Sequence, residues 1–162
     1  MSFFLPGDPL CTEPPPIEHR ALLLRTCRKG ADGALLAHGD FVWPAVVGAL
    51  VEAPDWSPRA GCGNGLHGCL WGEGDSSLMD WTENAVWMAV AVDTRDVVNL
   101  GGKVKAPRAW VMAVGDRCVA TDFIHDNGGA GHAIHGGTAT AGDSGTATAG
   151  DSGTATAGTR GT

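Results

Sequence analysis

The sequence predicts an α+β fold: a β-rich N-terminal globular domain followed by the start of a narrow parallel β-solenoid. Three observations lead to this prediction. Apolar runs of strand length, separated by Gly and Pro, occupy most of the chain. Near residue 120, apolar residues recur at helical spacing. From Gly137 to Thr162 the phrase GTATAGDS recurs, and such a short period is typical of stacked repeat structures.

Residues 1–19 are predicted to form an extended, Pro-rich lead-in. The run Pro14–Pro16 favours a polyproline conformation over a helix. The first ten residues lack a cationic start and are interrupted by Pro6 and Pro9. We therefore do not expect a secretory signal in this segment.

Residues 20–128 are predicted to form the β-rich globular domain. The apolar run Ala21–Cys27 is typical of a buried strand. The segment Ala85–Asp93 is apolar almost throughout, which indicates a central strand that is buried on both faces. Two further strands are expected in DVVNLGGKVKA and AWVMAVGD, with glycines and a proline at the turns.

One short helix is expected at the end of this domain, where Cys118, Val119 and Phe123 lie at helical spacing. The dipeptide Asn127-Gly128 is a typical C-terminal stop for such a helix. Residues 129–136, which include the two histidines of GHAIHGG, are predicted to form a Gly/His junction that acts as a linker.

The octad repeat occupies residues 137–162. Within each TATA the side chains alternate, so threonines face one side of a strand and alanines the other, while GDS is typical of a corner. The sequence therefore predicts a threonine surface and an alanine core. The surface residues are Thr138, Thr140, Thr146, Thr148, Thr154 and Thr156, and the core residues are Ala139, Ala141, Ala147, Ala149, Ala155 and Ala157.

Charge and composition exclude several classes of partner. The formal net charge of -7 argues against nucleic-acid binding, which needs a surplus of Lys and Arg on one face. The locally basic segment GGKVKAPR is interpreted as a solvated strand edge. No stretch is apolar enough to span a membrane, so no membrane partner is predicted. The five cysteines fit reduced thiols better than a disulfide framework, which favours a cytoplasmic location.

The glycine-rich segment Ala53–Asp75 permits two interpretations. It is either a tight turn that leads into a strand at GLHGCLW, or a cleft that carries chemistry. In the second case His67, Glu73 and Asp75 would supply general acid–base catalysis. The phrase G-x-G-L-H also resembles nucleotide-handling folds of the ADP-ribosyltransferase type, which implies a cleft for a nucleotide.

A metal site in the same segment would use Cys62, His67 and Cys69. Zinc takes four nitrogen or sulfur ligands, and the one-residue spacing of His67 and Cys69 places both on the same face of a strand. The chain has no C-x-x-C pair, however. We therefore predict no cofactor and keep zinc as the alternative.

Several phrases of the domain resemble a family of uncharacterised bacterial proteins. These phrases are VEAPDW, CGNGLHGCLWGEGD and GGKVKAPRAWV, and the resemblance covers most of residues 20–127. The GTATAG repeats resemble the octad repeats of bacterial ice-nucleation proteins. That second resemblance implies T-x-T rows that order water.

We therefore expect a non-enzymatic structural module. In this prediction the N-terminal domain caps a T-x-T repeat, and the repeat mediates self-association or the ordering of water or a surface. Self-association is expected because a short repeat leaves an unpaired strand edge. The alternative function is a small ligand-binding domain or enzyme with its cleft at CGNGLHG.

Overall fold

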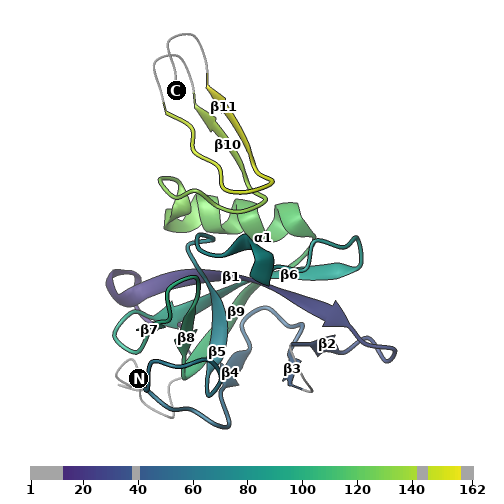
Figure 1. Ribbon diagram of the computed structural model, residues 1–162, viewed down its shortest axis with the longest axis vertical. Coiled ribbons are helices and arrows are strands. Elements are labelled where there is room, and N and C mark those ends of the chain that lie inside the picture. The colour runs from purple at the N-terminus through teal and green to yellow at the C-terminus, as the bar shows by residue number, and fades with distance from the viewer. Residues whose placement is uncertain (1–12, 38–40, 142–145, 158–162) are drawn as a thin grey trace.

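The computed structural model describes residues 13–37, 41–141 and 146–157 (Figure 1). The described part of the domain consists of an open, nine-stranded sheet in which all the strand pairs are antiparallel. One α-helix packs on this sheet, and the repeat projects beyond the helix. The strands of the domain are β1 Arg20–Lys29, β2 Leu35–Leu36, β3 Val42–Trp43, β4 Leu50–Glu52, β5 Leu66–Leu70, β6 Ala85–Asp93, β7 Val98–Asn99, β8 Val104–Ala106 and β9 Arg108–Gly115.

The centre of the sheet is the long pairing of β1 with β6, which runs from Arg20↔Asp93 to Arg28↔Ala85. The strand order is β4-β9-β6-β1-β5-β8-β7, with β2 added to β1 and β3 added to β2. The two apolar runs that predict strands from the sequence lie in β1 and β6, and both predictions are confirmed.

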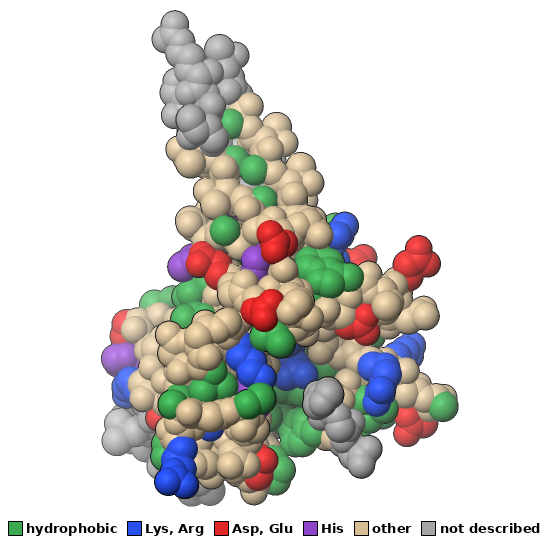
Figure 2. All heavy atoms as spheres, viewed as in Figure 1, with side chains coloured by type: hydrophobic (Ala, Val, Ile, Leu, Met, Phe, Trp, Pro, Cys, Tyr) green, Lys and Arg blue, Asp and Glu red, His purple; other side chains and the backbone are tan. Residues whose placement is uncertain are grey.

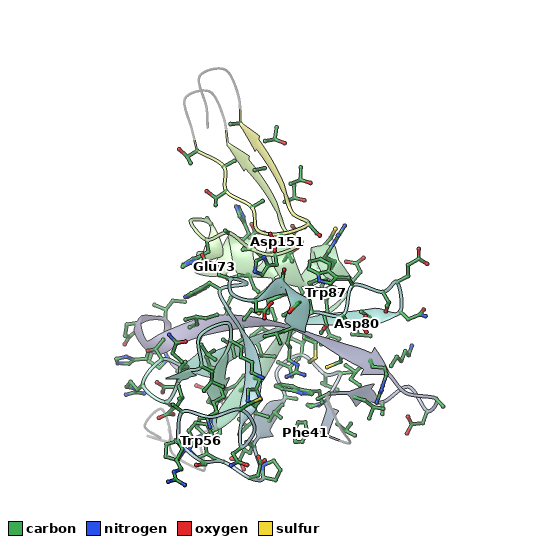
Figure 3. The ribbon with its side chains drawn as sticks, in the orientation of Figure 1. Phe41, Trp56, Glu73, Asp80, Trp87 and Asp151 are labelled. Carbon is green, nitrogen blue, oxygen red and sulfur yellow. The ribbon has the colours of Figure 1, made fainter. Side chains whose placement is uncertain are left out.

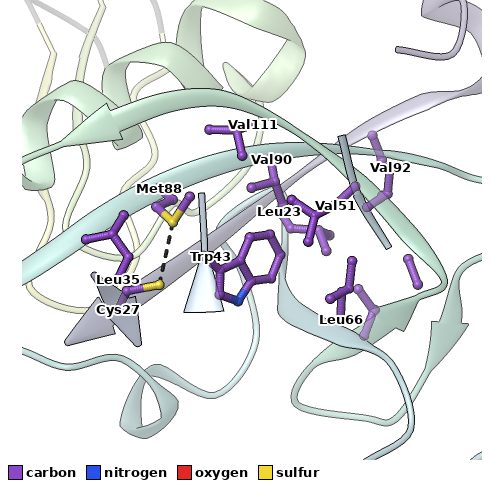
Figure 4. Close-up of a cluster of buried hydrophobic side chains, with 14 residues drawn as sticks. Leu23, Cys27, Leu35, Trp43, Val51, Leu66, Met88, Val90, Val92 and Val111 are labelled. Atoms are coloured by element: carbon purple, nitrogen blue, oxygen red, sulfur yellow. Dashed lines mark hydrogen bonds between the residues drawn. The ribbon is translucent and has the colours of Figure 1, made fainter. Parts of the chain in front are cut away.

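The sheet buries apolar side chains on both faces because the side chains of β1 and β6 alternate between two hydrophobic clusters. Figure 4 shows the first cluster, in which the thiol of Cys27 lies 3.5 Å from the sulfur of Met88. The second cluster lies under the helix. The first includes Leu23, Trp43, Val51, Met88 and Val90, and the second includes Leu24, Trp87, Trp110, Ala120 and Ile124.

Helix α1 spans Arg117–Ile124 and packs against β1, β6 and β9. Asp116 caps its first turn, because its carboxylate accepts a hydrogen bond from the Val119 amide. A π-helical turn, η3 (His125–Gly129), follows, and Gly128 leaves the helical conformation with a φ of 113°. The predicted helix and its stop near Asn127-Gly128 are confirmed. Two 3-10 turns, η1 (Ile17–His19) and η2 (Ser76–Leu78), complete the described helical elements.

The fold class predicted from the sequence is wrong, because the described residues form no parallel β-solenoid. The domain is a mostly antiparallel open sheet with one short helix. The described repeat contributes one parallel pair, β10 (Thr138–Ala141) with β11 (Thr154–Ala157), and residues 146–150 between them are not a strand. Two four-residue strands cannot enclose a core, and Ala155 is accordingly exposed.

No helix in the described ranges is long and apolar enough to cross a membrane.

Candidate functional site

Three segments meet where the repeat leaves the domain, and together they form what we call the joint. They are 71–76, which follows β5; 132–137, which precedes β10; and 150–153, which precedes β11. Figure 3 shows Glu73 and Asp151 facing this region from the first and third segments. Hydrogen bonds link all three segments.

Glycines shape the first segment of the joint. Gly72 has a φ of 75°, and a Cβ placed on it would lie 2.6 Å from Cγ2 of Ile134. Gly74 has a φ of 116°, and a Cβ there would collide with the carbonyl oxygen of Gly102. These conformations turn the chain back after β5, and glycine is the residue that adopts them without strain. As a result, the carbonyl oxygens of Gly72 and Gly74 point into the joint.

His135 binds both neighbouring segments of the joint. Its backbone N–H donates to the Gly72 carbonyl at 2.9 Å, and its ring Nε2 lies 2.8 Å from the Gly74 carbonyl. Its ring Nδ1 lies 2.9 Å from the backbone nitrogen of Asp151. The residue is only 8% exposed, so these bonds form in a buried environment. A single side chain therefore connects the domain to the repeat.

The corner Gly150–Asp151 is held mainly through its backbone. The Gly150 amide donates to the Ile134 carbonyl at 2.9 Å, and the Gly136 amide donates to the Asp151 carbonyl at 2.7 Å. The Ser76 hydroxyl donates to the Asp151 carboxylate at 2.6 Å. A Cβ on Gly150 would collide with the Ala133 carbonyl, so this corner requires glycine.

His132 and Glu73 form a second contact within the joint. His132 Nδ1 lies 2.7 Å from the Glu73 carboxylate, which also accepts the Ala133 amide at 3.0 Å. The His132 ring stacks on Trp71 with centroids 5.3 Å apart and planes at 11°. The two histidines that the sequence assigns to a linker are thus ordered components of a packed contact.

The three residues proposed for acid–base catalysis have separate surroundings. His67 lies on β5, its buried Nε2 has no hydrogen-bond partner among the described residues, and burial lowers its pKa. Glu73 belongs to the joint. Asp75 caps η2, and the hydrogen bonds from Ser77 lower its pKa. No described contact joins these three side chains, so the described residues do not assemble the predicted catalytic set.

The residues of the predicted metal site are also engaged separately. The exposed Cys62 sulfur accepts a hydrogen bond from Lys103 Nζ at 3.2 Å, which lowers the pKa of the thiol. Burial raises the pKa of Cys69 to about 11. Nowhere in the described part of the chain do three His, Cys, Asp or Glu side chains group closely enough to hold a metal ion. The four described cysteines, Cys27, Cys62, Cys69 and Cys118, are free thiols.

The basic segment GGKVKAPR is not the solvated strand edge that the sequence suggests. Lys105 is 1% exposed and pairs in register with His67 of β5. Its ammonium group lies 3.4 Å from the Gly63 carbonyl and 5.5 Å from the ring of Trp56. The alternation of β8 places the methylene stem of Lys105 inside the protein.

The described threonines of the repeat, Thr138, Thr146, Thr148, Thr154 and Thr156, are exposed. Ala147, Ala149 and Ala157 are half-buried, whereas Ala155 is exposed. The side chains of Ala139, Thr140 and Ala141 lie outside the described residues. Figure 2 shows the described repeat as a largely uncharged column, with acidic and His side chains at its base. The assignment of a threonine surface and an alanine core stays a prediction.

Sequence reasoning missed the joint because its residues come from distant segments that each look unremarkable. Ser76, His135 and Asp151 carry no shared motif. The sequence contains one signal of the joint: glycines lie next to both histidines in GHAIHGG, and two more glycines lie in WGEGD. Two glycine-rich segments in one small domain indicate a close approach of backbones.

Comparison with known proteins finds relatives that share one name. It is 35% identical over 109 residues to the ice nucleation protein InaU of Pantoea ananas, 37% over 110 residues to an ice nucleation protein of Pseudomonas fluorescens and 38% over 107 residues to one of Pseudomonas syringae. The chain is similar to bacterial ice nucleation proteins.

The similarity to ice nucleation proteins covers 65–67% of this chain but only 9–10% of these three relatives. The chain therefore spans about a tenth of the length of the curated relatives it matches. No family model matches the sequence, and no solved structure matches it. The resemblance to ice nucleation proteins is thus supported, while the uncharacterised domain family stays a prediction.

Proposed function

We propose that the chain is a structural, non-enzymatic element related to ice nucleation, in which the antiparallel domain anchors and caps strands of the GTATAG repeat. The observation that carries this proposal is the joint, where the corner Gly150–Asp151 makes three hydrogen bonds to residues 134–136 and a fourth to Ser76 of the domain. Sequence similarity to ice nucleation proteins over two thirds of the chain supports the class.

The capping role follows from where the parallel pair begins. The Thr154 amide donates to the Gly137 carbonyl at 2.7 Å, and the Gly137 amide donates to the Ile134 carbonyl at 3.1 Å. The backbone at this end of the β10–β11 pair is therefore satisfied by neighbouring segments. Unpaired backbone groups along a strand edge invite association with other chains. We propose that the domain, from which the pair projects (Figure 1), limits such association at this end.

The ordering of water is proposed from the spacing of the threonines. Thr138 lies opposite Thr154, and Thr140 lies opposite Thr156. Neighbouring strands lie about 4.8 Å apart, and alternate residues along a strand lie about 6.6 Å apart. Thr154 and Thr156 are exposed, so their hydroxyl groups are available to water in a regular array.

Droplet freezing of the full chain tests this role. We expect the median freezing temperature to exceed that of buffer and to fall in the variant Thr154→Val/Thr156→Val, because valine keeps the shape of threonine but lacks the hydroxyl group. The matched control is Thr94→Val, an exposed threonine of the domain. A freezing temperature equal to that of buffer for the unmodified chain contradicts the proposed ordering of water.

We also propose self-association through the repeat as the partner interaction. Sedimentation velocity over a wide concentration range is expected to show larger species for the full chain. The variant Thr154→Lys/Thr156→Lys places like charges on neighbouring copies and is expected to remain monomeric. Thr94→Lys, which adds charge on the domain, serves as the control. A monomer at every concentration contradicts this part of the proposal.

The cytoplasmic location also stays a proposal, supported by the four free thiols of the described chain.

A further inference from the structure

The hydrogen bonds of the His135 ring define its protonation state. A backbone N–H can only donate, so Nδ1 must accept from the Asp151 amide, which lies 2.9 Å away. A carbonyl oxygen can only accept, so Nε2 must carry the proton that it donates to Gly74, 2.8 Å away. Both bonds form together only in the neutral ring with its proton on Nε2.

A protonated ring does not fit this arrangement. Protonation adds a hydrogen to Nδ1, and this hydrogen would point at the N–H of Asp151 across 2.9 Å. Two donors would then face each other in a site where His135 is 8% exposed, and the Asp151 amide would lose its acceptor. Either the ring or the corner must move when the ring gains a proton.

The charged groups around His135 come from each segment that packs against it. Segment 71–76 contributes Glu73, which is bonded to His132, and Asp75, whose pKa is lowered in part by His135. The repeat corner contributes the Asp151 carboxylate, which accepts from Ser76. From α1, Arg117 lies beside Gly136.

These charged neighbours affect the stability of a protonated His135 ring in the docked and undocked states of the corner. Glu73 and Asp75 of the domain attract an imidazolium whether or not the corner is docked, so they favour the protonated ring without favouring docking. The Asp151 carboxylate of the corner opposes release, but it is already engaged by the Ser76 hydroxyl. Only the docked state requires an unprotonated Nδ1.

We infer that His135 is a pH-sensitive latch, whose neutral ring holds the Gly150–Asp151 corner on the domain and whose protonated ring releases it. The inference rests on the proposed function, because it assigns a regulator to the anchor. Histidine is the side chain that ordinarily changes charge between about pH 5 and 8, so this is the range of pH over which the latch is tested.

His132, the other histidine of the joint, has a different partner. Its ring lies 2.7 Å from the Glu73 carboxylate, and protonation strengthens such a contact instead of breaking it. The two histidines therefore respond to acid in opposite ways. The release of the repeat by acid should therefore depend on His135.

Backbone ¹⁵N relaxation of the full chain at about pH 8 and about pH 5 tests the latch. At the higher pH we expect order parameters near 0.85 for residues 146–157, and at the lower pH values below about 0.6. His135→Gln, which does not titrate, should abolish the difference between the two pH values. His125→Gln, a change at a histidine outside the joint, should retain it.

The possible outcomes separate the latch from the anchor. A repeat that is rigid at both pH values in the unmodified chain overturns the latch and leaves the anchor intact. A repeat that is mobile at both pH values overturns the anchor itself. A pH response that persists in His135→Gln, or one that is lost in His125→Gln while His135 is present, assigns the switch to another group and overturns the latch.

Discussion

The sulfur of Cys62 accepts a hydrogen bond from the ammonium group of Lys103, which lies 41 positions later in the sequence, at 3.2 Å. This contact joins the glycine-rich loop before β5 to the strand β8 region and lowers the pKa of an exposed thiol. Since the thiolate is the reactive form of cysteine, the contact has a chemical consequence that alkylation can measure.

We predict that Cys62 reacts with iodoacetamide at a lower pH than an ordinary cysteine does, because its pKa is lowered. The other exposed thiol of the described chain is Cys118. Lys103→Met should shift the pH profile of Cys62 upward, because the hydrogen bond and the positive charge are lost, and should leave Cys118 unchanged. Peptide mass spectrometry resolves the two sites. Equal profiles for Cys62 with and without Lys103 contradict the assignment.

Gly150→Ala should loosen the repeat from the domain. The new Cβ would collide with the Ala133 carbonyl and approach His135 Nδ1 to 2.6 Å, and overpacking of this kind costs about 1–3 kcal/mol. Amide hydrogen exchange over residues 146–157 should become faster. Gly131→Ala, which meets no atom within 4 Å, is the control. Unchanged exchange in Gly150→Ala would show that the corner is not tightly held.

Gly68→Ala should destabilise the domain, because a Cβ there would lie 2.8 Å from Cβ of Leu23 on β1. We expect the free energy of unfolding to fall by about 1–3 kcal/mol. Urea denaturation measures this change, and Gly61→Ala, in open space on the preceding loop, should leave the midpoint unaltered. Equal losses in both variants would mean that Gly68 does not serve close strand packing.

The buried carboxylate of Asp93 should make stability depend on pH. Hydrogen bonds from the Arg95 side chain, at 2.6 and 2.9 Å, lower its pKa in the folded state. The folded-state pKa thus lies below the unfolded value of about 3.9, so the stabilisation is complete above that value and is lost as the pH falls through the folded pKa.

Asp93→Asn should therefore reduce the free energy of unfolding by about 1–2 kcal/mol at neutral pH. The difference from the unmodified chain should shrink below about pH 4. Urea denaturation over a pH series provides the measurement. A difference that stays constant down to the lowest pH at which the chain folds would exclude a role for the Asp93 charge.

Local sequence patterns predict the elements whose burial is local. The buried side chains of β1, β6 and α1 follow patterns that are visible within each segment: apolar runs in the two strands and helical spacing in α1. The order of the strands and the burial of Lys105 depend on which distant segments pair with each other. The spacing of apolar residues in the sequence does not reveal this pairing. The joint is harder still to predict from the sequence, because the contacting residues His135 and Gly74 are 61 positions apart.

The wrong prediction of a β-solenoid has the same physical origin. The alternation in TATA predicts a strand, which β10 and β11 both form, whereas residues 146–149 have the same sequence and do not form a strand. Stacking into a larger structure requires apolar volume that these small side chains do not supply. The separate surroundings of His67, Glu73 and Asp75 show that closeness in sequence does not imply a shared site.

The in-register pairing of β10 with β11 also raises the question of what determines the strand register in a repetitive sequence. Successive octads are nearly identical, so a slip of one octad would match the same residues against one another. The domain removes this ambiguity because it binds one particular corner, Gly150–Asp151, at a site that each chain has once. The joint thus fixes which octad supplies β11 and so sets the register of the β10–β11 pair.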